Sequence, residues 1–186
     1  IYIRQGELKL ASEYFEKSLI SSRASKHPTL IASTLWDLAG IWENLGNYNK
    51  ARHYSEESLK VYREIGDKQG IAQTTYGVGW MYFWPGDNDA GRPYIEEALK
   101  LAQELGNHYL IIYAKNSLAL LKTYSAGDTI TAYKESQKAL ALSREVDLTY
   151  GIAYSLLALG MIAFAAGEYD KSQQHFEENL ALCTQI

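Results

Sequence analysis

A glycine-centred turn signal recurs along the chain at an almost constant interval. It stands at Gly6, Gly46, Gly86, Gly127 and Gly167, which gives intervals of 40, 40, 41 and 40 residues. Twelve residues after each glycine, a small or short side chain precedes a leucine: Ser18-Leu19, Ser58-Leu59, Ala98-Leu99, Ala139-Leu140 and Asn179-Leu180. Recurrence at one fixed offset predicts that the chain consists of stacked copies of one supersecondary unit.

Each unit contains two segments with a helical period. Further turn markers lie midway between the glycines, at Gly66, Gly106 and Asp147. After the first glycine, apolar and small residues follow the i, i+3, i+4, i+7, i+8 spacing of an amphipathic helix: Ala11, Tyr14, Phe15, Ser18 and Leu19. The first segments, at about 30–45, 69–84, 108–126 and 149–166, are richer in apolar residues. The pattern predicts an all-α fold, an α-solenoid of stacked antiparallel helix pairs.

Two stretches resemble the tetratricopeptide repeat (TPR). Residues 35–59 (LWDLAGIWENLGNYNKARHYSEESL) and 156–180 (LLALGMIAFAAGEYDKSQQHFEENL) place small and large residues on the first helix and Gly-Asn-Tyr or Gly-Glu-Tyr at the turn. The resemblance extends over the whole chain and implies a right-handed superhelix. It divides the single array 1–186 into a partial repeat, 1–26, and repeats at about 27–66, 67–106, 107–147 and 148–186.

The units depart from the TPR pattern in three respects. Gly91 and Pro93 fall in a second helix, where we expect Pro93 to occupy the first turn, and the unit 107–147 carries one extra residue in or just after its first helix. The 40-residue period exceeds the common one of about 34 residues. It resembles the longer repeats of bacterial signal-transduction ATPases and transcription regulators of the maltose-activator type, and of scaffold proteins that orient cell division.

The two ends of the sequence fall inside the repeat pattern. Ile1 aligns with Ile41, in the middle of a first helix, and Ile186 aligns with Ile65, just before a turn. We therefore expect the sequence to be a fragment of a longer array.

The stretch GVGWMYFWPGD, residues 77–87, gives the first helix of one unit two opposite faces. At about 100° per residue, one row is expected to pack within the array: Thr75, Val78, Gly79 and Tyr82. A second row is aromatic and lies on the other side: Tyr76, Trp80, Phe83 and Trp84. Pro85-Gly86 is expected to end the helix. In the proteins it resembles, the first helices line the concave surface, so the second row is expected to face a groove.

Corresponding residues of the other first helices complete the predicted binding groove. Its members are Trp36, Tyr76, Trp80, Phe83, Trp84, Tyr113, Leu121, Tyr124, Tyr154, Met161 and Phe164. Contiguous apolar surface of this kind marks interaction sites. The alternative is that this row packs against a neighbouring helix, and the sequence leaves both interpretations open.

No pattern indicates catalysis, a metal or a cofactor, so we expect a protein that is not an enzyme. The four histidines, His27, His53, His108 and His175, fall in separate units and none forms an H-E-x-x-H motif. Gly77 and Gly79 are expected to permit close helix packing, and Cys183 to be a buried, inert thiol. Acidic pairs recur at one offset and predict a solvated face: Glu56-Glu57, Glu96-Glu97 and Glu177-Glu178.

Composition excludes several classes of partner. The 186 residues are 47% hydrophobic and 22% charged, with a net charge of −4 and basic residues interspersed among acidic ones. This favours a globular chain without a nucleic-acid surface. No apolar run reaches the roughly 20 residues of a membrane span, and one cysteine excludes an internal disulfide. We expect a cytoplasmic protein, neither membrane-bound nor a secreted precursor.

The leading functional prediction is a protein–protein interaction or scaffold module that binds a peptide or partner helix in the aromatic concave groove. One alternative is an effector-sensing domain of a bacterial ATPase-type transcription or signalling regulator. The other alternative is a self-association element.

Overall fold

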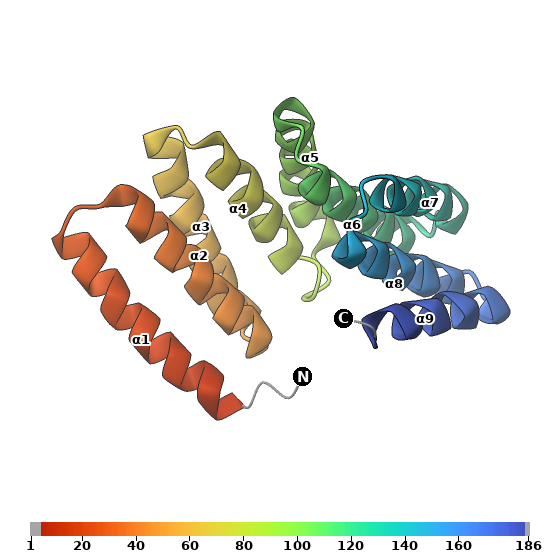
Figure 1. Ribbon diagram of the computed structural model, residues 1–186, viewed down its shortest axis with the longest axis horizontal. Coiled ribbons are helices and arrows are strands. Elements are labelled where there is room, and N and C mark those ends of the chain that lie inside the picture. The colour runs from red at the N-terminus through yellow and green to blue at the C-terminus, as the bar shows by residue number, and fades with distance from the viewer. Residues whose placement is uncertain (1–4, 185–186) are drawn as a thin grey trace. The chain divides into compact units, whose positions relative to one another are not determined.

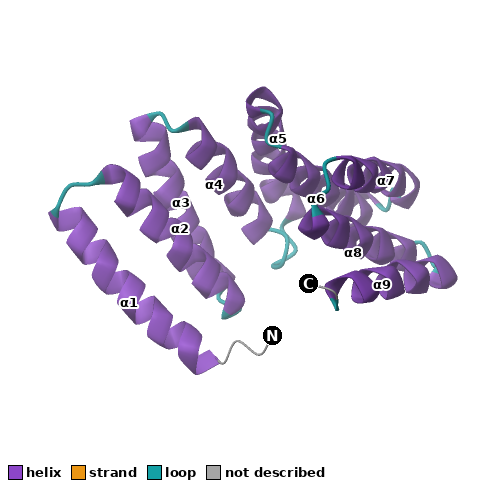
Figure 2. Ribbon diagram, in the orientation of Figure 1, coloured by secondary structure: helices purple, strands orange, loops and turns teal. Residues whose placement is uncertain are grey.

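The computed structural model describes residues 5–184, and this part of the chain is entirely α-helical, without a strand (Figure 2). The helices are α1 (Gln5–Ala24), α2 (Pro28–Asn44), α3 (Tyr48–Ile65), α4 (Lys68–Met81), α5 (Asn88–Leu105), α6 (His108–Ala126), α7 (Thr129–Glu145), α8 (Thr149–Ala165) and α9 (Tyr169–Cys183). The predicted all-α fold is confirmed. Ile1 and Ile186, on which the expectation of a longer array depends, lie outside the described residues.

The chain forms two compact units, unit 1 (residues 1–94) and unit 2 (residues 95–186), with the boundary inside α5. In unit 1, each helix from α1 to α4 packs against the next, and Figure 1 shows them side by side. In unit 2, α6 to α9 pack in the same sequential way, and α6 also packs against α8. Because the connecting turns are short, consecutive helices are antiparallel. Each unit is thus a stack of antiparallel helix pairs, the local arrangement of an α-solenoid.

The recurrent turn residues stop one helix and start the next. Four helices begin with an Asn or Asp side chain that accepts the backbone N–H three residues later: Asn47, Asp67, Asn107 and Asp128. Left-handed glycines follow helix ends, with φ of 72° at Gly66 and 66° at Gly127. Asp147 takes the same region with φ 51°. The repeated turn signal is therefore a pair of helix caps.

Leucines at the repeated offset form the core of each unit. In unit 1, Leu19 packs with Leu35 and Leu38, and all three are buried. In unit 2, Leu140 packs in the same way with Leu156 and Leu159 of α8. These contacts bury the apolar rows of the second helices α1 and α7 against the first helices that follow them, and the same contact thus recurs in both units.

The second helices turn their acidic pairs to solvent, as predicted. Glu56, Glu96 and Glu177 are exposed. Two of the neighbouring carboxylates bind an arginine from the preceding second helix: Glu57 pairs with Arg23, and Glu178 with Arg144, at 2.6 Å. The equal spacing of the two pairs shows that the stacking of second helices repeats as well.

One helix boundary and the position of one proline differ from those predicted. The helix α4 ends at Met81, short of Trp84, because Tyr82 and Phe83 donate three residues back, to Gly79 and Trp80, and Pro85 disfavours helix at the residue before it. Pro93 lies inside α5 and not in its first turn, because the helix already begins at Asn88.

The extra residue of the unit 107–147 lies in its first helix, as predicted. The helix α6 has 19 residues, whereas α2 and α8 each have 17. Cys183 was wrongly predicted to be buried. It is exposed at the end of α9, because no described helix covers that face.

Candidate functional site

Aromatic side chains at the end of α4 form a continuous cluster in unit 1. Trp80 stacks on Phe83 with ring centroids 4.8 Å apart, and on Tyr76 at 6.5 Å. Trp84 meets Trp80 edge-on at 5.9 Å and stacks on Tyr48 of α3 at 6.1 Å. We call these five residues the aromatic cluster of unit 1. Trp84 keeps 51% of its surface exposed, so the cluster is open to solvent at this end.

Trp36 lies between helices. Its six-membered ring lies against Gly77 of α4, where a Cβ would overlap it, and the side chain is half-buried. The opposite row of α4 is the packing face, with Thr75 and Val78 fully buried. Gly79 is buried as well, and its carbonyl oxygen lies where a Cβ on Gly91 would have to go. The predicted close-packing role is confirmed for Gly77, and at Gly79 it is the missing Cβ of Gly91 that permits the close approach.

Glu43 of α2 lies beside the aromatic cluster. The indole of Trp80 donates a hydrogen bond to its carboxylate. Burial raises the pKa of Glu43 above its ordinary value, and the hydrogen bond from Trp80 offsets part of that shift. Within residues 5–184, no basic side chain forms an ion pair with Glu43. A desolvated carboxylate thus borders the aromatic rings.

The first helices of unit 2 carry a stack of tyrosines. Tyr109 and Tyr113 of α6 stack with centroids 4.3 Å apart, and Tyr113 stacks on Tyr154 of α8 at 4.5 Å. The hydroxyls of Ser117 and Tyr154 are hydrogen-bonded at 3.1 Å. Burial, reinforced by neighbouring tyrosines that include Tyr109, raises the pKa of Tyr113 well above its usual range. We call Tyr109, Tyr113 and Tyr154 the tyrosine stack of unit 2.

The remaining predicted groove residues have different environments. Tyr124 and Phe164 are exposed, and Met161 is half-buried. Leu121 is completely buried and lies in the core instead of on a surface. The reason is helical geometry: two steps of four residues rotate Leu121 by about 80° from Tyr113. The structure therefore brings Tyr76, Trp80, Phe83 and Trp84 together in unit 1, and Tyr113 with Tyr154 in unit 2. Trp36 lies against Gly77 and makes no ring contact with this group among the described residues.

The face of α9 is unusually apolar for an exposed surface. Leu180 is 66% exposed, whereas Leu140, at the same offset of the preceding unit, is 8% exposed because α8 covers it. An open pocket of about 450 Å³ lies along this face and includes Phe164, Tyr169, Phe176 and Leu180. We call these four residues the α9 face.

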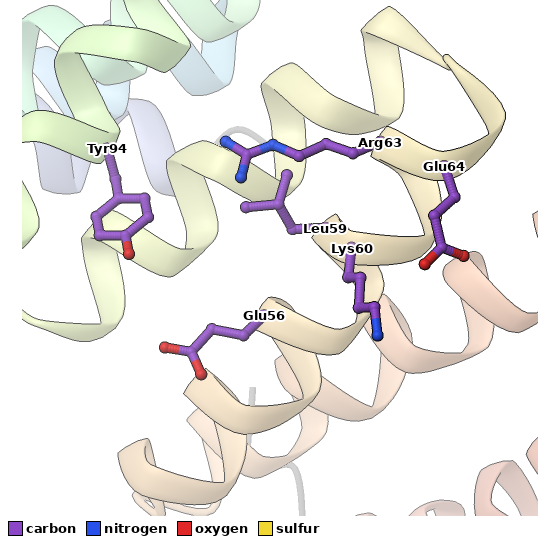
Figure 3. Close-up of a pocket in the computed structure, with 6 residues that line it drawn as sticks. All are labelled: Glu56, Leu59, Lys60, Arg63, Glu64 and Tyr94. Atoms are coloured by element: carbon purple, nitrogen blue, oxygen red, sulfur yellow. The ribbon is translucent and has the colours of Figure 1, made fainter.

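A second pocket in unit 1, also about 450 Å³, lies against α3 (Figure 3). Five of its residues come from α3 and one from α5: Glu56, Leu59, Lys60, Arg63, Glu64 and Tyr94. Its two carboxylates and two basic groups balance, so it favours neither sign of charge.

Metal chemistry finds no support in residues 5–184. No group of three or more His, Cys, Asp or Glu side chains in this part could hold a metal ion. His175 is half-buried, and its Nε2 is hydrogen-bonded to the Tyr133 hydroxyl at 2.6 Å. This contact gives the histidine a structural role in linking α9 to α7. Among the described helices, none combines the length and apolarity that crossing a membrane requires.

Sequence reasoning missed several residues of these faces. Tyr109 and Tyr150 each precede a predicted tyrosine by one helical turn, so the helical period could have identified them. The 40-residue period aligns Glu43 with Phe83 and so places it on the same row, whereas Tyr48 had no such signal. They join the aromatic cluster only because α2 and the start of α3 pack near the end of α4.

Two family models match parts of the chain. The tetratricopeptide repeat model matches residues 31–65, and the model of anaphase-promoting complex subunit 5 matches residues 80–125. No curated protein matches the sequence significantly.

Several solved structures share the fold at low sequence identity. BtubC (BKLC) from P. vanneervenii has a TM-score of 0.77 and 20% identity, over 99% of this chain and 76% of that one. A Rap protein complexed with competence and sporulation factor has a TM-score of 0.82 and 17% identity, over 98% and 51%. NprR in complex with its cognate peptide NprX has a TM-score of 0.78 and 15% identity, over 97% and 52%. The chain thus spans about half the length of the Rap and NprR chains. It contains a tetratricopeptide repeat at residues 31–65, and its fold is that of the TPR-like helical-repeat proteins.

Proposed function

We propose that this protein is a non-catalytic scaffold that binds a peptide segment of a partner protein on the exposed faces of its first helices. The observation that carries the proposal is the accessibility of large aromatic side chains on these helices and the turns that follow them. They are Trp84 in unit 1, and Tyr109, Tyr124, Tyr150 and Phe164 in unit 2. Aromatic residues are the commonest anchors of protein interfaces.

The structural neighbours support this proposal at the level of fold. The Rap and NprR structures named above are complexes with competence and sporulation factor and with the peptide NprX. A helical-repeat fold of this type therefore offers a surface on which a short peptide can bind. For this chain, the aromatic cluster of unit 1 and the tyrosine stack of unit 2 are the proposed contact areas.

A phage-displayed library of random dodecamer peptides, selected on the purified chain, tests the proposal. We expect enriched sequences whose affinity, measured by calorimetry, falls at least about tenfold in a Trp84→Ala or Tyr109→Ala variant. Tyr14→Ala is the matched control, because Tyr14 is also a large exposed aromatic residue but lies on α1, which is a second helix of its unit. Circular dichroism establishes that each variant is folded. Failure to enrich any peptide, or equal loss in the control, would contradict the proposal.

Self-association is a second candidate function, and the α9 face favours it. Leu180 occupies an offset that is buried in the preceding unit, at Leu140, so a second copy could cover the α9 face in the same way. Sedimentation equilibrium at several concentrations should then show an average mass that rises with concentration. Leu180→Ser should abolish the rise, and Leu10→Ser, at a similarly exposed leucine of α1, should not. A constant monomeric mass removes this candidate.

The effector-sensing alternative stays a prediction. It shares the proposed contact areas but requires a small molecule as ligand. A thermal-shift screen of the purified chain against metabolites separates it from peptide binding, because only a ligand of the folded state raises the unfolding temperature.

A further inference from the structure

The charge that borders the aromatic cluster of unit 1 indicates what type of side chain a bound peptide would place there. Glu43 is partly buried, and within residues 5–184 its only hydrogen-bonding partner is Trp80. An indole N–H supplies one hydrogen bond, whereas an ionised carboxylate can accept about four. Glu43 therefore keeps acceptor capacity beside the rings, in a position where water is partly excluded.

The rings next to Glu43 complement a positive charge. Tryptophan is the aromatic side chain that attracts a cation most strongly over its face. Contacts of this kind already occur within unit 1, where Lys50 Nζ lies 3.8 Å from the ring centroid of Trp42 and the Arg52 guanidinium lies 4.8 Å from that of Tyr82. Neither of these basic groups pairs with Glu43.

The two observations converge on one type of ligand. Trp84 is half exposed and contacts Trp80 edge-on, and Trp80 donates a hydrogen bond to Glu43, so Trp80 joins the exposed ring to the carboxylate. A neutral apolar side chain would cover Glu43 without satisfying it, which is unfavourable. A guanidinium or ammonium group would satisfy both the carboxylate and the rings.

We propose that Glu43, Trp80 and Trp84 form a recognition site for an arginine or lysine side chain of the bound peptide. The proposal rests on the proposed function, because it specifies a residue of the peptide that the first helices bind. The stems of these side chains are apolar and pack on the rings, while the charged group reaches Glu43. Arginine fits better than lysine, because its planar group can stack and donate two hydrogen bonds at once.

Four undecapeptide libraries, identical except for a fixed central Arg, Lys, Gln or Glu, test the site by fluorescence anisotropy with the full chain. We expect the Arg library to bind most tightly, at least about fivefold better than the Gln library, with the Glu library weakest. Glu43→Gln keeps the shape and still accepts from Trp80, so it should remove the preference for Arg over Gln while the Gln library binds unchanged. Trp84→Ala should weaken the Arg library more than the Gln library.

Glu13→Gln is the matched control, since Glu13 is an exposed acid of the same unit on α1, and it should leave every affinity unchanged. Equal binding of the Arg and Gln libraries would overturn this inference while the peptide-binding function stands. A preference for Arg that persists in Glu43→Gln would overturn it too, because the cation would then bind elsewhere. Binding of no library would instead contradict the proposed function itself.

Discussion

The six-membered ring of Trp36 on α2 lies against the backbone of Gly77 on α4, in a position that a Cβ on residue 77 would occupy. This contact joins two first helices of unit 1. It also explains how a tryptophan of the predicted groove can be half-buried without belonging to the leucine core. Glycine within a helix costs stability, so its presence at this position reflects the space that the ring needs.

Gly77→Ala should therefore destabilise unit 1. We expect a loss of about 1–3 kcal/mol in the free energy of unfolding, since the Trp36 ring must move out of its position. The matched control is Gly40→Ala, a helical glycine whose added methyl would meet no atom within 4 Å. That substitution should stabilise by about 0.5–1 kcal/mol. Urea denaturation followed by tryptophan fluorescence measures both free energies of unfolding. An unchanged free energy in Gly77→Ala would contradict the prediction, because it would mean that the Trp36 ring can move aside without cost.

The buried amide of Asn116 gives a second prediction. Its Nδ2 donates to Ser155 Oγ at 2.8 Å and to the Ile112 carbonyl at 3.1 Å, so it links α6 to α8. Ser155→Ala removes one acceptor from a group that water does not reach, and should cost about 1–3 kcal/mol. Ser33→Ala is the control, because Ser33 is half-exposed and bonds only to Leu30 of its own helix. Equal midpoints in urea for the two variants would contradict this account.

Alkaline pH should weaken unit 2 through Tyr113. Burial raises the pKa of this phenol above the ordinary value of 10.0, whereas in the unfolded chain the pKa is near the ordinary value. The contribution of the neutral Tyr113 phenol to the stability of the folded state is thus fully present below about pH 10. It is lost as the pH rises further, because the unfolded state then releases the proton while the folded state retains it. Tyr113→Phe should lessen the fall in urea midpoint between about pH 9 and about pH 11. A fall of the same size in this variant would exclude Tyr113 as its source.

Mildly acidic pH should destabilise unit 2 through His175. Burial lowers its pKa below 6.5, despite the opposing attraction of Glu178, while Arg144 and Lys171 favour the neutral ring. Its Nε2 is hydrogen-bonded to the Tyr133 hydroxyl at 2.6 Å. Stability is therefore present above pH 6.5 and declines as the pH falls below it, because the unfolded state protonates first. A histidine titration by NMR should give a pKa below 6.5 for His175, and Tyr133→Phe, which removes the hydrogen-bonding hydroxyl, should change this pKa.

Much of the fold could be predicted because it follows from local chemistry. The Gly-Asn and Gly-Asp signals mark helix caps, and those caps form at Asn47, Asp67 and Asp128. The helical period identified the packing row on α4: Thr75, Val78 and Gly79 are buried, and Tyr82 is half-buried. Predictions that depended on a helix boundary were weaker. Pro93 and Trp84 show this, because one or two residues decide whether a side chain lies in a helix, in its first turn or beyond its end.

The sequence by itself determined the repeat, the helix pairs and which first helices carry aromatic residues, because a helix of known period places its own side chains on known faces. Only the tertiary structure decided which of these side chains meet. It placed Leu121 in the core, Trp36 against Gly77, and Glu43 beside Trp80. Such contacts depend on how one helix is rotated and shifted against another, and that arrangement follows from the packing of many side chains together.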